Sequence, residues 1–214
     1  MKYITVVLTT FCRLDNAQKI LDALRVQSVK PVLFLWDNAK RDWDCGAVDW
    51  RIRSAPNSKC FGRWWMLSQA ETDYVMSIDD DLCPTAPAML EKIIGFLETN
   101  PDTIIGPEGV ILKKEGSQRY SQGQHYIAEK TETTWVDIVK GRIMAMTPHK
   151  MRTSRFGEWN ASAEDDLLVN TYYPRKCVPS LFFRSTTNLP EGGESLRKRK
   201  DHYQIRNNFV ETFF

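Results

Sequence analysis

The chain has 214 residues, a mass of 24.8 kDa and 42% hydrophobic residues, which is enough to bury one sizeable core. Its 29 basic and 27 acidic side chains give a net charge of +2, which argues against a protein that binds nucleic acid by bulk charge. Five widely spaced cysteines without a CxxC pair indicate free thiols. No run reaches the length of a membrane span and no signal-peptide pattern is present, so we expect a cytoplasmic protein without an integral membrane segment, either a monomer or part of a larger chain.

The first part of the chain alternates strand and helix patterns. Residues 3–8 are an apolar, β-branched run, and residues 17–24 carry apolar side chains at helical spacing behind a cap at Asp15 and Asn16. A second apolar run covers residues 32–36. Continuous apolar strands joined by a helix predict a parallel sheet that is covered on both faces.

The chain is organised around a third apolar run, residues 74–78, which follows an aromatic helix pattern at 61–68 and ends in Asp79, Asp80 and Asp81. A core strand stops being apolar where it leaves the sheet, so the three aspartates should lie at its carboxyl end. Open α/β sheets bind ligands at that edge.

The remaining chain predicts a helix at 87–97 and then shorter strands at 103–112, 120–128 and 134–146, separated by glycine and charged turns. These shorter strands indicate an antiparallel or mixed second half. A second acidic cluster, Glu164, Asp165 and Asp166, has the composition of a helix N-terminus. The tail carries the one strongly basic run, Arg197 to Lys200.

Three adjacent carboxylates repel one another, and a bound divalent cation would allow all three to stay ionised. Side chains alternate along an extended segment, so Asp79 and Asp81 should point the same way and share the cation, while Asp80 points elsewhere. Oxygen ligands favour Mg²⁺ or Mn²⁺. The alternative is a solvated acidic turn that caps the next helix.

Polar residues at the ends of the first two strands should meet at the same edge. Thr9, Thr10 and Arg13 follow the first strand, and Asp37 and Asn38 follow the second. They predict a nucleotide pocket. A metal on one side and cationic side chains of the tail on the other would together hold a diphosphate, which suits group transfer from a nucleotide donor.

The ordered motifs resemble those of nucleotide-sugar-dependent glycosyltransferases of the GT-A fold, over most of the chain. The matching pieces are residues 6–13, Asp37-Asn38, the DxD-like segment 77–81, and 164–166. The triple aspartate, together with the segment from His202 through Arg206 to Phe209, is most similar to the exostosin-like branch and to small glycosyltransferase domains of chlorella viruses. In contrast to the exostosin-like branch, we expect this protein to have no luminal anchor.

The resemblance implies an α/β, Rossmann-like GT-A fold with a mostly parallel central sheet, in one domain spanning residues 1–214. Residues 1–100 would form the nucleotide-binding half, and residues 101–214 the smaller acceptor-binding half with a C-terminal lid.

The resemblance also assigns three sets of side chains, with Mn²⁺ or Mg²⁺ as cofactor. The metal ligands would be Asp81, Asp79 and His202. The acceptor-facing catalytic carboxylates would be Asp165, Asp166 and Glu164, with one of the two aspartates as general base or as stabiliser of an oxocarbenium-like centre. The nucleotide-sugar contacts would come from Thr9, Thr10, Arg13, Asp37, Asn38, Arg63, Asp79, Asp80, Lys198 and Arg199.

The predicted function is therefore transfer of a sugar, glucose or a related hexose or deoxyhexose, from a UDP-sugar donor to a carbohydrate or glycoconjugate acceptor, with retention. One alternative is a metal-dependent nuclease or phosphoesterase that uses Asp79, Asp81 and Asp165 as paired-metal ligands. Another is a module that binds a nucleotide-sugar or glycan without turning it over.

Overall fold

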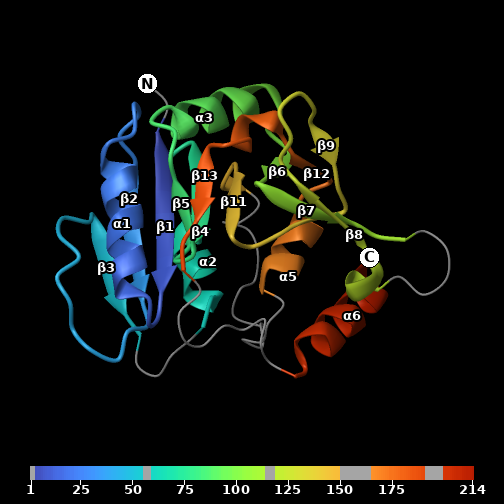
Figure 1. Cartoon of the computed structure of the whole chain (residues 1–214), viewed down its shortest axis with the longest axis horizontal. Coiled ribbons are helices and arrows are strands. Elements are labelled where there is room, and N and C mark those ends of the chain that lie inside the picture. Colours follow the sequence, from blue (N-terminus) through green and yellow to red (C-terminus); the bar gives the residue numbers. More distant parts are fainter. Residues whose placement is uncertain (1–2, 55–58, 114–118, 150–164, 191–199) are drawn as a thin grey trace.

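The computed structural model describes residues 3–54, 59–113, 119–149, 165–190 and 200–214 (Figure 1). Its main sheet has eight strands in the order β3-β2-β1-β4-β11-β6-β12-β9. In chain order these strands are β1 (Ile4–Thr10), β2 (Val32–Asp37), β3 (Trp50–Arg53), β4 (Tyr74–Asp79), β6 (Thr103–Ile105), β9 (Thr134–Trp135), β11 (Ile143–Met146) and β12 (Arg175–Val178).

The sheet is parallel on one side and mixed on the other. Strands β3, β2, β1 and β4 run parallel, whereas β11 runs antiparallel to both β4 and β6, and β9 antiparallel to β12. Two small antiparallel sheets accompany the main sheet, β10-β7-β8 and β13-β5. Their strands are β5 (Leu82–Pro84), β7 (Glu108–Ile111), β8 (Gln124–Ile127), β10 (Ile138–Val139) and β13 (Thr186–Asn188).

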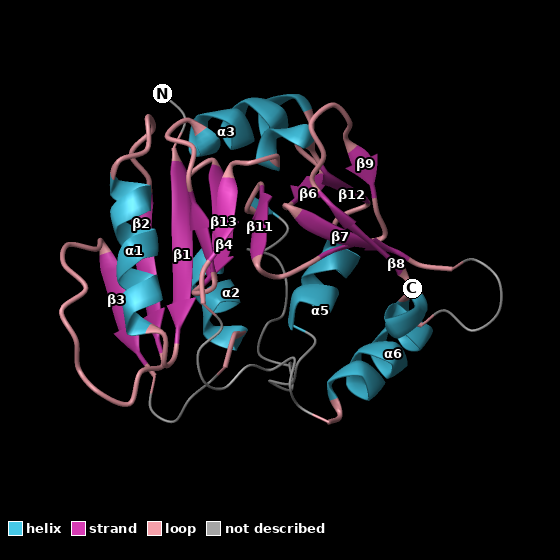
Figure 2. Ribbon diagram, viewed as in Figure 1, coloured by secondary structure: helices cyan, strands magenta, loops and turns pink. Residues whose placement is uncertain are grey.

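Helices cover both faces of the parallel strands (Figure 2). Helices α1 (Leu14–Arg25) and α3 (Met89–Thr99) pack on one face, where Val6 and Leu8 of β1 join their core. Helices α2 (Phe61–Ser68) and α5 (Asp165–Tyr172) contribute to the core on the other face, together with Val7 of β1. Alternate β1 side chains thus enter two cores, which confirms the predicted α/β class with a sheet buried on both sides.

Three further elements lie in the second half. The C-terminal helix α6 (His202–Phe213) packs beside α5 and the short 3₁₀ turn η1 (Tyr120–Gln122). A second 3₁₀ turn, η3 (Ser180–Phe182), precedes β13. No helix in the described ranges is long and apolar enough to cross a membrane.

The start of α1 differs from the sequence prediction. Helix α1 begins at Leu14, and no side chain caps its N-terminus, so the predicted cap at Asp15 and Asn16 is wrong. Asn16 lies inside the helix and donates through Nδ2 to the main-chain oxygens of Asp80 and Pro190, each at 3.0 Å. The long-range contacts explain the asparagine, because it ties α1 to the acidic end of β4.

Candidate functional site

The three aspartates lie at the carboxyl end of β4, as predicted. The register of the parallel pair places Thr9 of β1 opposite Asp79, so the acidic segment borders the end of β1. Asp79 closes β4, and β5 begins at Leu82 after a tight turn. The three carboxylates therefore sit at the edge where parallel sheets bind ligands.

Asp80 faces inward and completes the end of β1. Its carboxylate accepts hydrogen bonds from Thr10 Oγ1 at 3.0 Å and from the main-chain nitrogen of Phe11 at 3.3 Å. Its Oδ1 pairs with Arg13 Nη1 at 2.8 Å. Burial raises the pKa of Asp80, and Arg13, Thr10 and Phe11 act against that rise. These contacts give Asp80 a structural role at the end of β1, and it shares Arg13 with Asp81.

Asp79 and Asp81 each pair with a different arginine and each remain partly exposed, by 26% and 17% of their side chains. Asp79 Oδ1 accepts from the buried Arg63. Asp81 Oδ1 accepts from Arg142 Nε at 3.0 Å, and its Oδ2 lies 3.5 Å from Arg13 Nη1. Burial raises the pKa of Asp79 despite Arg63, and Asp81 and Asp80 raise it further, so these carboxylates sense one another's charge.

Arg13, Arg63 and Arg142 thus pair with the three aspartates. From the sequence we expected a metal ion to balance these carboxylates. Arg142 is the most connected of the three arginines, because its Nη1 also donates to Glu108 Oε1 at 2.6 Å and its Nη2 to Asn188 Oδ1 at 2.8 Å. Burial opposes ionisation of Glu108, but Lys140 and Arg142 lower its pKa overall. The network joins β4, β7, β11 and β13 around Asp81.

The chemistry of the donor set still fits a hard divalent cation. Asp79 Oδ2 accepts no hydrogen bond from the described residues, and Asp81 Oδ2 has only the long contact to Arg13. Both carboxylates are partly exposed, and hard cations take such oxygens together with oxygens of a bound ligand. Across the described residues, no three His, Cys, Asp or Glu side chains gather as a metal site, so Asp79, Asp81 and His202 are not brought together as one ligand set.

Arg63 connects the acidic end of β4 to the second acidic cluster. It is 2% exposed, stacks at 4.8 Å from the Trp64 ring centroid and donates to Asp79. Its Nη2 also donates to Asp165 Oδ2 at 2.9 Å, and Trp64 Nε1 donates to the same oxygen at 2.7 Å. Asp165 Oδ1 accepts no hydrogen bond from the described residues. The guanidinium between Asp79 and Asp165 speaks against the paired-metal set of the nuclease alternative.

Asp166 has a different environment from Asp165. Both of its oxygens pair with Arg206, at 2.8 Å to Nη1 and 2.9 Å to Nη2, and the main-chain nitrogen of Gly141 donates to Oδ2 at 3.1 Å. Burial alone would raise the pKa of Asp166, but Arg206 lowers it overall. A buried carboxylate with a bidentate arginine is a poor base. Of the two aspartates, Asp165 is the better candidate for chemistry.

The predicted nucleotide rim divides into one available side chain and several engaged ones. Thr9 Oγ1 is buried and has no hydrogen-bond partner among the described residues. Asp37 is fully buried and accepts from Arg51 Nη2 at 2.6 Å, from the main-chain nitrogen of Ala39 at 2.8 Å and from Trp43 Nε1 at 3.2 Å. Asp37 therefore forms hydrogen bonds inside the protein and is buried away from the surface where a nucleotide would bind.

Asn38 is also engaged, since its Nδ2 donates to the main-chain oxygen of Lys59 at 2.8 Å and its Oδ1 accepts from Trp36 Nε1 at 3.2 Å. His202 is the first residue of α6, and its ring centroid lies 5.3 Å from that of Tyr203. The remaining predicted site residues, Glu164, Lys198 and Arg199, lie outside the described residues.

The sequence reading missed the partners that hold these acids. Arg142, Arg206 and Trp64 received no site role, although each contacts one of the aspartates. A glycine beside Arg142 was the one available signal: a Cβ on Gly141 would lie 2.9 Å from Asp166 Cβ and 3.2 Å from Arg63 Nη2. Because glycine has no side chain, the chain at Gly141 can pass this close to Asp166 and Arg63.

No protein-family model and no curated protein matches the chain. Several solved structures, in contrast, are similar to it in fold. Residues 1–349 of TarS from S. aureus, in complex with UDP-GlcNAc, align at a TM-score of 0.68 and 14% identity over 95% of this chain and 64% of theirs. The same TarS fragment, in a second structure, aligns at 0.58 and 16% over 83% of this chain and 58% of that one. The mannosyltransferase PcManGT from Pyrobaculum calidifontis, in complex with GDP-Man and Mn²⁺, aligns at 0.61 and 14% over 96% and 63%.

The shared architecture confirms the predicted GT-A fold for this chain. The chain spans less than two thirds of the length of either neighbour. At 14% identity the likeness establishes the fold, and the activity has to be argued from the side chains.

Proposed function

We propose that this protein is a metal-dependent glycosyltransferase that moves a sugar, glucose or a related hexose or deoxyhexose, from a UDP-sugar to a carbohydrate or glycoconjugate acceptor. The observation that carries the proposal is the placement of Asp79 and Asp81, two partly exposed carboxylates at the carboxyl end of a central parallel strand in a GT-A fold. The neighbours' complexes with UDP-GlcNAc and with GDP-Man and Mn²⁺ support a nucleotide-sugar donor and a divalent cation.

Asp81 and Asp79 would hold Mn²⁺ or Mg²⁺, with donor oxygens completing the coordination. When bound, the cation supplies Lewis-acid stabilisation of the negative charge that develops on the departing diphosphate. Thr9, whose buried hydroxyl has no partner in the described residues, would donate to the nucleotide.

Asp165 would face the reacting sugar. Arg63 and Trp64 both donate to its Oδ2, which fixes the carboxylate and leaves Oδ1 for the ligand. We assign to Asp165 the stabilisation of the oxocarbenium-like centre, consistent with the retention that the exostosin-like resemblance implies. Arg63 and Asp166 position this carboxylate: Arg63 holds it directly, and Asp166 anchors the first turn of its helix through Arg206.

Calorimetric titration with a panel of nucleoside diphosphates and their sugars tests the proposal, with Mn²⁺ present and then removed by a chelator. We expect one uridine nucleotide to bind only with metal. The variant Asp81→Asn keeps an oxygen for Arg142 but removes the charge, so metal-dependent binding should be lost. Asp73→Ala, an exposed aspartate just before the opposite end of β4, is the control and should bind as the wild type.

Failure of every nucleotide to bind in the presence of metal would refute the proposal. Unchanged affinity in Asp81→Asn would refute the metal assignment alone. Incubation of the donor with acceptor glycans and assignment of the anomeric product by NMR then decides between retention and inversion. Binding without transfer to any acceptor or to water would favour the non-catalytic module.

A further inference from the structure

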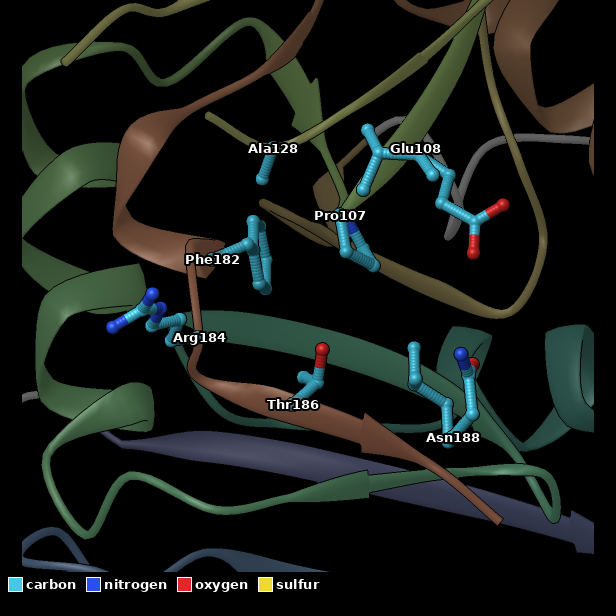
Figure 3. A pocket seen from close by; sticks show the side chains of 9 residues that line it. Pro107, Glu108, Ala128, Phe182, Arg184, Thr186 and Asn188 are labelled. Atoms are coloured by element: carbon cyan, nitrogen blue, oxygen red, sulfur yellow. The ribbon is translucent and has the colours of Figure 1, made fainter. Parts of the chain in front are cut away.

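A cavity of about 150 Å³ lies between the β5–β13 ribbon and the β7–β8 hairpin (Figure 3). Figure 3 shows Phe182 and Pro107 facing Thr186 across the cavity, with Glu108 and Asn188 toward one end. None of these five residues is a proposed ligand of the donor or its metal, although Glu108 and Asn188 contact Arg142, the partner of Asp81. The cavity is therefore a candidate site for a ligand other than the donor.

The cavity adjoins the acidic segment through a single side chain. Arg142 donates to Glu108 and Asn188, which line the cavity, and to the carboxylate and main-chain oxygens of Asp81, each at 3.0 Å. Leu82, the residue after Asp81, is also part of the lining. A molecule in the cavity would consequently contact Leu82, which directly follows the proposed metal ligand Asp81 in the sequence.

The lining is amphipathic in the way that suits a pyranose. Phe182, Pro107 and Leu82 offer apolar surface, on which the C–H face of a sugar ring can pack. Thr186, Glu108 and Asn188 offer a hydroxyl, a carboxylate and an amide, which can exchange hydrogen bonds with sugar hydroxyls. The charge of the Glu108 carboxylate is already balanced by Lys140 Nζ at 3.0 Å and Arg142 Nη1 at 2.6 Å, so this carboxylate does not call for an ionic ligand and a neutral sugar suits it.

The size and rigidity of the cavity narrow the ligand further. Drug-sized ligands occupy pockets of roughly 300–1,000 Å³, so this one suits a single small unit. Arg184 in its wall has a positive φ of 53°, a conformation that costs energy for a non-glycine residue and is found at functional sites. Thr85 fixes that segment, because its nitrogen donates to the Ser185 oxygen at 2.8 Å and its Oγ1 to the Arg184 oxygen at 3.2 Å.

We propose that this cavity binds one neutral monosaccharide unit of the acceptor glycan, beside the acidic end of β4. That the sugar belongs to an acceptor rests on the proposed transferase function. The cavity and its preference for a neutral sugar rest on the lining alone. Apolar packing on Phe182 would orient the ring, and Asn188 with Glu108 would select its hydroxyl pattern.

The test is an NMR titration of isotopically labelled full chain with methyl glycosides of glucose, galactose, mannose and N-acetylglucosamine. We expect at least one glycoside to shift the amide signals of Thr186 and Asn188 in a saturable manner. Thr186→Trp, which fills the cavity, should weaken that binding by roughly tenfold or more. Thr187→Trp is the matched control, because the exposed Thr187 alternates to the other face of β13 and should leave binding unchanged.

Two results would overturn the cavity assignment: no glycoside shifts these signals, or Thr186→Trp binds the glycoside as the wild type does. Nucleotide calorimetry on the same samples separates the two proposals. Glycoside binding without any nucleotide binding would refute the transferase and leave the cavity as a sugar site. Nucleotide binding without glycoside binding would refute the cavity proposal alone.

Discussion

The pair between Asp166 and Arg206 offers the sharpest test of how the candidate site is held. Both side chains are buried and share two hydrogen bonds of 2.8 and 2.9 Å, and the guanidinium lies 4.1 Å from the Tyr120 ring centroid. Replacing Arg206 with methionine keeps the apolar contact but leaves a buried carboxylate without its cation. Breaking such a pair costs about 3–5 kcal/mol. For a chain of this size that lowers Tm by roughly 10 °C.

Thermal and urea unfolding as a function of pH measures this cost. In the wild type the pKa of Asp166 is lowered from its usual value of 3.8, which stabilises the folded protein at any pH above 3.8. This stabilisation is lost as the pH falls through the folded-state pKa. In Arg206→Met the largest opposing cause is gone, so we expect burial to dominate and to raise the pKa of Asp166. The folded variant then takes up a proton more readily than the unfolded chain, so its penalty is largest at neutral pH and shrinks in acid.

Two variants control this experiment. Gln204→Met introduces the same side chain at an exposed position of α6 and should leave stability within about 0.5 kcal/mol of the wild type. Asp166→Asn combined with Arg206→Met removes the stranded charge and should recover part of the loss. A loss below about 1 kcal/mol in Arg206→Met, the level of a surface pair, would refute the reasoning, as would a double variant no more stable than the single one.

Two further substitutions test the roles of individual acids. Asp37→Asn removes the charge from a fully buried, ion-paired carboxylate, so we expect about 3 kcal/mol less stability by urea unfolding but unchanged nucleotide affinity in the folded protein; a selective loss of affinity would instead return Asp37 to the nucleotide pocket. Trp64→Phe removes the 2.7 Å hydrogen bond to Asp165, so kcat should fall by roughly tenfold with donor affinity retained; equal kcat would show that this hydrogen bond does not orient the carboxylate.

The parallel half of the fold could be predicted because its signals are local. Strands β1, β2 and β4 are continuous apolar runs, and α1 and α3 repeat apolar residues at helical spacing. Elements without such patterns were missed. β3 is a partly exposed edge strand that contains two arginines, and α6 buries only Arg206 and Val210, so neither shows an apolar stripe.

The position of the three aspartates was predictable, but the charges that balance them were not. Arg13 is the N-cap of α1, Arg63 lies in α2 and Arg142 is the residue before β11, and each is at least 16 residues from the aspartate that it pairs with. A single sequence shows which residues carry charge, and the fold decides which of them meet. Asp80 turns into the end of β1 while Asp79 and Asp81 stay partly exposed. Residues 80–81 form a turn rather than an extended segment, and Asp80 and Asp81 both contact Arg13, so simple alternation along a strand does not describe them.

The arginines also bear on how metal and donor would enter. Because Arg13, Arg63 and Arg142 already pair with the three aspartates, they disfavour a lone divalent cation, whereas a cation bound together with a diphosphate brings compensating negative charge. We therefore expect weak Mn²⁺ binding alone and binding roughly tenfold or more tighter with UDP, with the same factor for UDP in the presence of Mn²⁺ because linkage is reciprocal. Titration of Mn²⁺ followed by its electron paramagnetic resonance signal, with and without UDP, measures both factors. Equal Mn²⁺ affinity with and without UDP would mean that the arginines do not set the charge balance, and that the carboxylates bind metal independently of the donor.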